Sequence, residues 1–235
     1  MSLINENDLE LACLQYFGQI GYQTAFGPEL LPEGENPLRV DVRQPFLPED
    51  IKSALRRLNP AVPEDILQEA FRALTQPQEA SPIARNEAIY YYLTDGILIP
   101  HKNAQGEDTA TRVYIVDYQH PDNNEFLAIN QFALQGPVNV RRPDILVFLN
   151  GLPIAILELK NPSNAHTDVQ SAFNQIQTYR DDIPDLFDYN LACVLTDGIV
   201  ARIGAFTADE SRYMPWRTIG DQEAPAGMLE AEVLM

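Results

Sequence analysis

Two apolar runs on either side of an Asn-Gly pair constrain this chain more than any other feature of its sequence. The first run covers residues 144–149 and the second covers 153–160, with Asn150 and Gly151 between them. Asn-Gly favours the tight turn of a β-hairpin because both residues readily adopt positive φ. Both faces of each run are apolar, which is typical of central strands covered on two sides. We therefore predict two antiparallel strands at the centre of a sheet.

Three charged side chains, those of Asp144, Glu158 and Lys160, stand at the open end of this hairpin. A charge in strands covered on both faces is costly unless it is paired or bound to a metal ion. Because side chains alternate along a strand, Glu158 and Lys160 share one face. A three-residue loop (150–152) would set Asp144 opposite Glu158 on that face. A two-residue loop would set it opposite Leu157 and point the carboxylates apart, so the functional interpretation requires the longer loop.

The chemistry of these residues favours a metal site. Carboxylates on directly opposed strand residues, with Cβ atoms about 4.5–5.5 Å apart, repel each other unless a cation lies between them. Asp144, Glu158 and the backbone carbonyl of Leu159 form an oxygen-rich set suited to Mg²⁺, with Mn²⁺ as a substitute. Such an ion activates water and neutralises charge on a phosphodiester, while Lys160 would orient or stabilise the hydroxide. The pattern predicts metal-dependent phosphodiester hydrolysis; an ion pair of Glu158 with Lys160 capping the sheet is the alternative.

The composition of the chain excludes several other classes of protein. The 235 residues, 45% of them hydrophobic, suit one globular domain of ordinary size. A net charge of −18 disfavours a protein that binds nucleic acid over its whole surface, although a local basic site stays compatible with it. The sequence contains no phosphate-binding loop, zinc-ligand spacing or serine-hydrolase elbow. Its start lacks a basic leader, no apolar run could span a membrane, and it has only two cysteines, so we expect a cytoplasmic protein without membrane contact.

The periodicity of the apolar residues predicts helices in the first half of the chain and most of the strands in the second half. We expect an amphipathic helix over 6–20, two helices that begin at Pro48 and Pro63, and another near 81–93. Strand candidates, besides the hairpin, are Leu38–Val42, Val113–Tyr118 and Phe126–Leu134. The sum is an α/β domain with a mixed central β-sheet flanked by helices.

Pro143-Asp144 followed by Glu158-Leu159-Lys160 resembles the PD-(D/E)XK nuclease motif. The surrounding sequence resembles the N-terminal nuclease domain of the R (motor) subunit of type I restriction enzymes over residues 6–217. The stretches that carry this resemblance are Gly21-Tyr22 to Gly27-Pro28-Glu29, Leu58-Asn59-Pro60, Asn130-Gln131-Phe132, Arg141-Arg142-Pro143-Asp144, Asn150-Gly151-Leu152-Pro153, Glu158-Leu159-Lys160-Asn161-Pro162 and Trp216-Arg217.

The resemblance implies a domain organisation and an activity. Residues 1–220 would form a PD-(D/E)XK (restriction endonuclease-like) core with an N-terminal helical insertion over about 48–93. Residues 221–235 would be a linker or the start of a downstream motor domain. The domain would cut double-stranded DNA after ATP-driven translocation by motor domains outside this chain, in a complex with the modification and specificity subunits.

Two other functions compete with this one. A non-catalytic docking domain could retain the nuclease fold to contact the other subunits, although docking needs no aligned charges in apolar strands. A stand-alone repair nuclease fits less well, because the domain is acidic and lacks a DNA-binding motif of its own.

The resemblance also implies roles for residues outside the hairpin. Gln175 and Tyr179 match the family's Gln-x-x-x-Tyr motif and would share one helix face, positioning DNA or the active site, with a packing role as the alternative. Glu10, on an early helix, would be a further metal ligand unless it is a solvated carboxylate. Arg141 and Arg142 would contact phosphates, the alternative being charge compensation beside the carboxylates.

Overall fold

A six-stranded mixed sheet forms the centre of the molecule. The computed structural model describes residues 6–160, 169–197, 200–215, 218–219 and 222–223. In sheet order the strands are β1 (Gln23–Phe26), β4 (Phe126–Asn130), β7 (Ile145–Leu149), β8 (Leu152–Leu159), β9 (Ala192–Thr196) and β10 (Ala201–Gly204). The β1–β4 and β8–β9 pairs are parallel, and the other three are antiparallel. The predicted α/β class with a mixed central sheet is confirmed.

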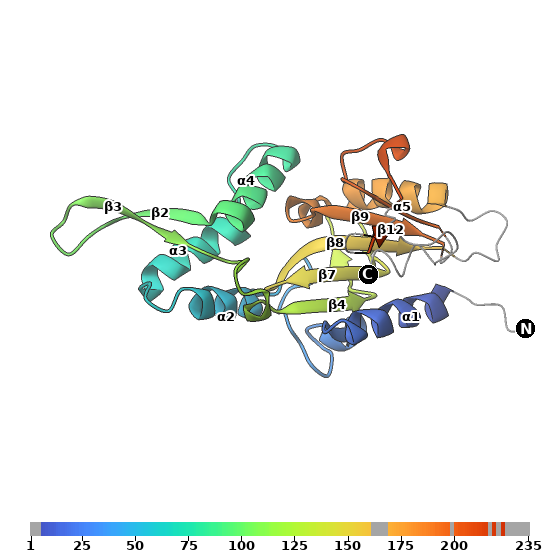
Figure 1. The fold of residues 1–235 in the computed structure, drawn as a ribbon, viewed down its shortest axis with the longest axis horizontal. Helices are drawn as coiled ribbons and strands as arrows, with labels where there is room; N and C mark the ends of the chain where they lie inside the picture. The colour runs from blue at the N-terminus through green and yellow to red at the C-terminus, as the bar shows by residue number, and fades with distance from the viewer. Residues whose placement is uncertain (1–5, 161–168, 198–199, 216–217, 220–221, 224–235) are drawn as a thin grey trace, which may run out of the picture.

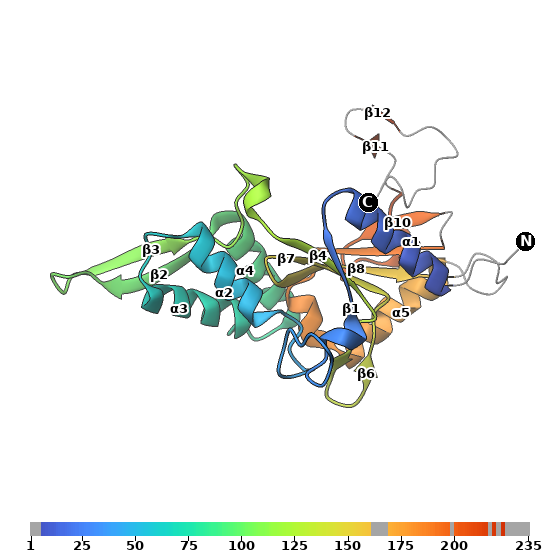
Figure 2. The same ribbon diagram turned by 90° about the horizontal axis from the view of Figure 1, so that it is seen from below.

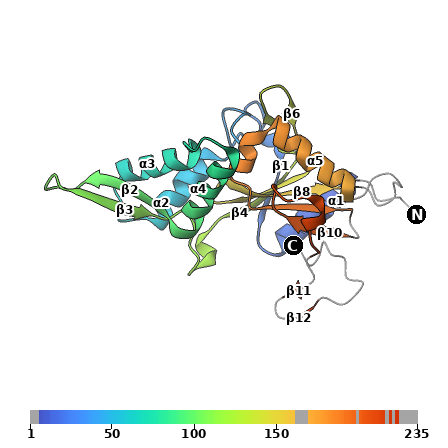
Figure 3. The same cartoon turned by 90° about the horizontal axis from the view of Figure 1, so that it is seen from above.

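Helices cover both faces of this sheet (Figure 1). Helix α1 (Glu6–Gln19) packs Cys13 and Phe17 on one face, and α5 (Val169–Asp182) packs Ile176 on the other. Figure 3 shows α5 lying over β8. The two apolar faces of β7 and β8 therefore each have a helix to pack against, which explains their unbroken hydrophobic sequence.

A second group of elements extends from one end of the sheet and carries its own core (Figures 1 and 2). It consists of α2 (Pro48–Leu58), α3 (Glu64–Thr75), α4 (Pro82–Asp95) and the projecting hairpin of β2 (Ile97–Lys102) and β3 (Asp108–Val113). Leu149 and Leu152, at the hairpin turn of the central sheet, belong to this core and join the two parts. The division of the chain into an insertion and a nuclease core stays a prediction.

The remaining elements are short. They are the 3-10 helices η1 (Gly27–Leu30), η2 (Pro121–Asn123), η3 (Pro184–Asp188) and η4 (Glu210–Arg212), and the paired strands β5 (Leu134–Gln135) with β6 (Val140–Arg141) and β11 (Thr218–Ile219) with β12 (Gln222–Glu223). Among the helices of the described residues, none combines the length and apolarity that crossing a bilayer would require.

The strand predicted over Leu38–Val42 is wrong. This segment is irregular, and Val40 is 87% exposed instead of packing in a sheet. Arg39 is buried, places its guanidinium 3.7 Å from the centre of the Phe132 ring, and donates hydrogen bonds to backbone carbonyls, including that of Ala133. A buried cation that satisfies loop carbonyls replaces the ladder that alternating apolar residues had suggested.

Two other strand predictions need correction. Strand β3 ends at Val113, where the predicted Val113–Tyr118 strand was to begin, because the Asn59 side chain bonds both the N–H and the C=O of Tyr114. The predicted Phe126–Leu134 strand ends as β4 at Asn130, because Gln131 has a φ of 54°. The predicted helices all form, although α3 begins at Glu64, one residue after Pro63.

The turn between β7 and β8 has two residues, so the expected three-residue loop is wrong. Asn150 and Gly151 have φ values of 49° and 84°, and Leu149 pairs with Leu152 across them. The buried Asn150 side chain also holds the surrounding loops in place, because it forms hydrogen bonds with Arg57, Ile115, Asn124 and Glu125. Left-handed geometry at both central residues is the reason that Asn-Gly suits this turn.

A β-bulge nevertheless produces the register that the longer loop was meant to supply. The strand pairs are Phe148–Pro153, Val147–Ala155 and Ile145–Leu157, so that Ile154 is the extra residue. Because the bulge shifts the register by one, the next pair outward is Asp144 with Glu158. The two carboxylates therefore face each other despite the short turn.

Candidate active site at the ends of strands β7 and β8

The three charged residues predicted from the hairpin meet at the end of the sheet opposite the projecting β2–β3 hairpin (Figure 1). Asp144 directly precedes β7, Glu158 is the penultimate residue of β8, and Lys160 follows β8. The backbone N–H of Leu159 donates to Asp144 Oδ2 over 2.7 Å. This bond fixes Asp144 beside the end of β8, so the predicted proximity is confirmed; the catalytic roles stay predictions.

Glu158 is buried, at 2% exposure, and both of its oxygens accept hydrogen bonds. Lys160 Nζ donates to Oε1 over 2.6 Å, and the Tyr179 hydroxyl donates to Oε2 over 3.1 Å. Burial raises the pKa of Glu158, and the two donors oppose this rise without cancelling it. Glu158 is thus a carboxylate held in place by two partners and poorly solvated.

The pKa of Asp144 is raised as well. Burial, followed by the charge of Glu158, raises the pKa of Asp144 to about 8, while the Leu159 N–H and Lys160 act in the opposite direction. No other hydrogen bond to the Asp144 side chain is found within the described part of the chain. The positive charge beside the two carboxylates is therefore too small to offset their burial, which is common for paired carboxylates at functional sites.

Lys160 supplies the compensating charge at this site. Its side chain is 15% exposed. Burial alone would lower the pKa of Lys160, but the charges of Glu158 and Asp144 outweigh burial and raise the pKa above its ordinary value. Lys160 is consequently an ammonium ion that can donate hydrogen bonds but cannot serve as a base near neutral pH.

Gln175 and Tyr179 reach the site together from one face of α5, as predicted. The Tyr179 hydroxyl bonds the Gln175 side chain as well as Glu158. Burial and the neighbouring carboxylates raise the pKa of Tyr179, so the hydroxyl keeps its proton. Tyr179 is also part of the core, so it packs as the alternative interpretation expects, while its role in positioning DNA or the active site stays a prediction.

Glu10 lies beneath the site and is 5% exposed, so the solvated-carboxylate alternative is wrong. Asn130 Nδ2 donates to Oε2 over 3.1 Å, and Gln131 Nε2 donates to Oε1 over 2.9 Å. No role for Asn130 or Gln131 was predicted from the sequence. The signal available was the Asn130-Gln131-Phe132 stretch at the end of a strand candidate.

The two predicted phosphate contacts differ in their surroundings. Arg141 binds Asp182 through Nε and Nη2, each 2.5 Å from Oδ2. A hydrogen bond from Asn139 and this ion pair together lower the pKa of Asp182. Arg142 is exposed, and its side chain has no ion pair with any described residue. Of the two, Arg142 is the more available to a phosphate.

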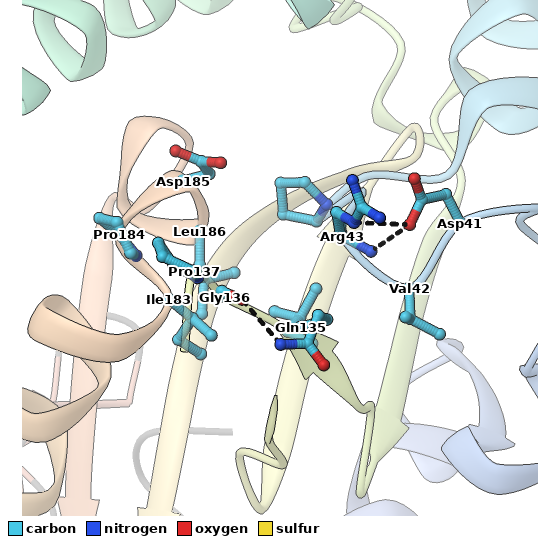
Figure 4. Close-up of a pocket in the computed structure, with 12 residues that line it drawn as sticks. Asp41, Val42, Arg43, Gln135, Gly136, Pro137, Ile183, Pro184, Asp185 and Leu186 are labelled. Atoms are coloured by element: carbon cyan, nitrogen blue, oxygen red, sulfur yellow. Dashed lines mark hydrogen bonds and ion pairs between the residues drawn. The ribbon is translucent and has the colours of Figure 1, made fainter. Parts of the chain in front are cut away.

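Glu158 and several of its neighbours line a solvent-open cavity of about 460 Å³. Its walls are formed by Gln131, Val140, Arg141, Arg142, Glu158, Gln175 and Tyr179. A wider cleft of about 620 Å³ lies between the 41–45 loop and η3, where Arg43 is paired with Asp41 (Figure 4). Because Glu158 lines the smaller cavity and is hydrogen-bonded to Lys160, the smaller cavity is the candidate active site.

The donors at this cavity fit a hard divalent cation that keeps part of its water shell. Within the described ranges, no three His, Cys, Asp or Glu side chains converge as a complete metal site. Two facing carboxylates are available, and Lys160 is the one cation found in contact with either of them among the described residues. Mg²⁺ commonly binds proteins through one or two carboxylates, with water and phosphate oxygens completing its shell.

Some residues that carried the family resemblance lie outside the described residues. They are Asn161-Pro162 and Trp216-Arg217, together with the predicted linker after residue 223. Of the remaining stretches, those from Leu58 onward contain the buried Asn59, Gln131, the Asn-Gly turn and the carboxylate pair.

The hairpin, its carboxylate pair and the helix that carries Tyr179 all lie within a stretch that matches a known protein family. Residues 3–212 match the family described as the type I restriction enzyme R protein N terminus. The chain belongs to this family.

Named relatives agree with the family. The type I restriction enzyme HindI endonuclease subunit of Haemophilus influenzae is 36% identical over 225 residues, which is 95% of this chain and 21% of that protein. The provisionally named MjaIXP endonuclease subunit of Methanocaldococcus jannaschii is 31% identical over 214 residues, 90% of this chain and 20% of that protein. The chain thus spans about a fifth of the length of the curated relatives it matches.

Proposed function

We propose that this domain hydrolyses DNA phosphodiester bonds, as the nuclease module of a type I restriction endonuclease subunit with a PD-(D/E)XK core. The observation that supports this most is the bulged hairpin that sets Asp144 against Glu158 with Lys160 beside them. Buried like charges destabilise a fold unless they serve a ligand. A docking domain would gain nothing from this arrangement, which is why we prefer catalysis.

Asp144 and Glu158 would hold Mg²⁺, with Mn²⁺ as a substitute. The Leu159 N–H points at Asp144, and since the N–H and C=O of one strand residue point to the same side, the Leu159 carbonyl would be a third protein ligand. When bound, the ion supplies an activated water and neutralises charge on the scissile phosphate.

The other residues of the site have roles that follow from their contacts. Lys160, charged and held 2.6 Å from Glu158, would orient the attacking hydroxide and stabilise negative charge on the phosphate. Tyr179, supported by Gln175, would hold Glu158 in its binding orientation. Arg142, at the rim, would contact a DNA phosphate.

The wider assembly follows from the family. We propose double-stranded DNA as substrate, modification and specificity subunits as partners, and ATP-driven translocation by motor domains outside this chain, all in the cytoplasm. The names of the relatives support an endonuclease subunit, and this chain corresponds to about a fifth of such a subunit.

The test uses the full-length subunit assembled with its partner subunits. Glu158→Ala and Lys160→Ala should abolish DNA cleavage and leave ATP hydrolysis nearly intact, because the motor is a separate module. Lys102→Ala, which removes an exposed lysine paired with Asp108 on the projecting hairpin, is the matched control and should cleave normally. Cleavage at the wild-type rate by Lys160→Ala would remove the basis of the proposal.

A further inference from the structure

We propose that Glu10 and Gln131 act as a positioning pair that fixes Asp144, and that Glu10 does not bind the catalytic cation. The inference deepens the proposed function and rests on it. It reassigns the early-helix carboxylate, which the family resemblance had suggested as a metal ligand, on the basis of hydrogen bonds around the end of β4.

Gln131 is the link between Glu10 and Asp144. Its backbone N–H donates to the Asp144 carbonyl over 3.0 Å, and its side-chain amide donates to Glu10 Oε1 over 2.9 Å. One residue therefore bonds the main chain of a predicted metal ligand and the side chain of a buried acid. Any rotation of the Gln131 peptide would move the Asp144 carbonyl and, with it, the start of β7.

The conformation of Gln131 requires support. With a φ of 54° it is one of two residues other than glycine in the left-handed region among those described. Non-glycine residues remain in that region only where their surroundings determine it, and such residues concentrate at functional sites. The second left-handed residue, Asn150, has an obvious reason in the hairpin turn, whereas Gln131 lies at no hairpin.

Three contacts supply that support from different elements. Glu10 on α1 holds the side chains of both Asn130 and Gln131. Gly27 packs against the backbone of these two residues so closely that a Cβ there would lie 2.5 Å from the Gln131 carbonyl oxygen. The next residue, Phe132, is fully buried against Phe148.

The hydrogen bonds of Glu10 account for its burial without a cation. Each carboxylate oxygen already accepts a bond from an amide, and both amides lie at the end of β4. No bond from Glu10 to Asp144, Glu158 or Lys160 is found in the described part of the chain. A ligand would have to share these oxygens with Asn130 and Gln131.

The test exchanges the two side chains in the full-length, assembled enzyme. Glu10→Gln alone leaves one acceptor for two amide donors, and Gln131→Glu alone places two carboxylates together. Each single variant should lower the cleavage rate at saturating Mn²⁺ by about tenfold, the rate factor for one hydrogen bond of about 1.4 kcal/mol. In the double variant the new amide at position 10 can donate to the new carboxylate at position 131, so cleavage should recover to within about threefold of wild type.

The second readout is the Mn²⁺ concentration that gives half of the metal-induced rise in melting temperature. Positioning predicts a double variant close to wild type in this value. If Glu10 is a ligand, the double variant stays inactive and requires about tenfold or more additional Mn²⁺, which would overturn the inference. Lys160→Ala, measured in parallel, tests the proposed function separately, because its full activity would refute the nuclease site whatever the exchange shows.

Discussion

Asp144 and Glu158 are like charges that the fold holds on one face of the sheet, where burial raises the pKa of both and the charge of Glu158 raises that of Asp144 further. The sequence singled these residues out, because charged residues in apolar strands are conspicuous, but it placed them face to face only through a loop length that is wrong. It was not sufficient to predict the hydrogen bonds of Glu10, since those depend on the conformation of Gln131 after β4 ends. A single residue in the left-handed region leaves no periodic pattern in the sequence.

The raised pKa of Asp144 predicts how stability depends on pH without metal. Because its folded pKa of about 8 exceeds the ordinary value near 4, this carboxyl contributes stability that is full below about pH 4 and lost as pH rises through about 8. Asp144→Asn should therefore become more stable relative to wild type between pH 5 and 9, by roughly 2 kcal/mol, which is about half of the linkage over this range because solvent reaches the carboxyl.

Urea unfolding in a chelator would measure this difference. The pKa of Asp182 is lowered by Asn139 and Arg141, so its contribution to stability is present above its ordinary pKa and is lost only in acid. Asp182→Asn should accordingly show no pH-dependent difference from wild type over the same range. Parallel pH curves for Asp144→Asn and wild type would contradict the assigned pKa.

The hydroxyl of Tyr179 offers a test of positioning at the site. Tyr179→Phe removes the donor to Glu158 Oε2 and should lower DNA cleavage by the assembled enzyme about tenfold or more, while costing about 1–2 kcal/mol of stability. Tyr189→Phe removes a similarly buried hydroxyl that donates to Leu74 O over 2.9 Å, far from the cavity, and should reduce stability alone. Equal cleavage by the two variants would show that Tyr179 only packs.

At the scale of elements, the hairpin shows where sequence-based reasoning ends. Alternation and Asn-Gly predicted β7 and β8, and the same reasoning required a three-residue loop to bring the acids together. The chain instead uses a two-residue turn and a bulge at Ile154. Pairing registers cannot be counted from a loop when an extra residue is absorbed within a strand, and nothing in the alternation of 153–160 marks that residue.

Gly151 makes the turn testable. A Cβ there would lie 2.7 Å from the Leu47 carbonyl oxygen, in addition to the strain of a φ of 84°. Gly106, in the turn of the projecting hairpin, has a φ of 80° and open space around it. Gly106→Ala should cost about 1 kcal/mol from strain alone, and Gly151→Ala about 2–4 kcal/mol because α2 packs on the turn. Equal losses of stability in the two variants, measured by thermal unfolding, would contradict the contact between α2 and the turn.

At the scale of the whole molecule, two faces of a mixed sheet are covered by α1 and α5, and a separate helical core continues from one end. The class of fold could be predicted because helical and strand periodicities are strong. The irregular segment around Arg39 could not, since a buried cation satisfying loop carbonyls leaves the same alternation as a strand.

The charge of the whole chain predicts weak DNA binding by the isolated domain. With a net charge of −18, its affinity for a short duplex at physiological salt should be no tighter than about 10⁻⁴ M. Arg142→Ala should weaken it further, whereas exposed Arg43→Ala, at the other cleft, should not. Fluorescence anisotropy would measure both, and a dissociation constant near 1 µM would favour a stand-alone nuclease.

The central claim is that the Asp144–Glu158 pair binds a divalent cation, and a Mn²⁺ titration followed by thermal unfolding tests it most directly. At about a hundred times its dissociation constant, Mn²⁺ should stabilise the wild type by roughly 2.7 kcal/mol. Asp144→Asn should lose most of this gain, Lys160→Ala should keep or increase it, and Asp108→Asn, which removes an exposed carboxylate on the projecting hairpin, should match wild type. Equal Mn²⁺-induced shifts for Asp144→Asn and wild type would contradict the account.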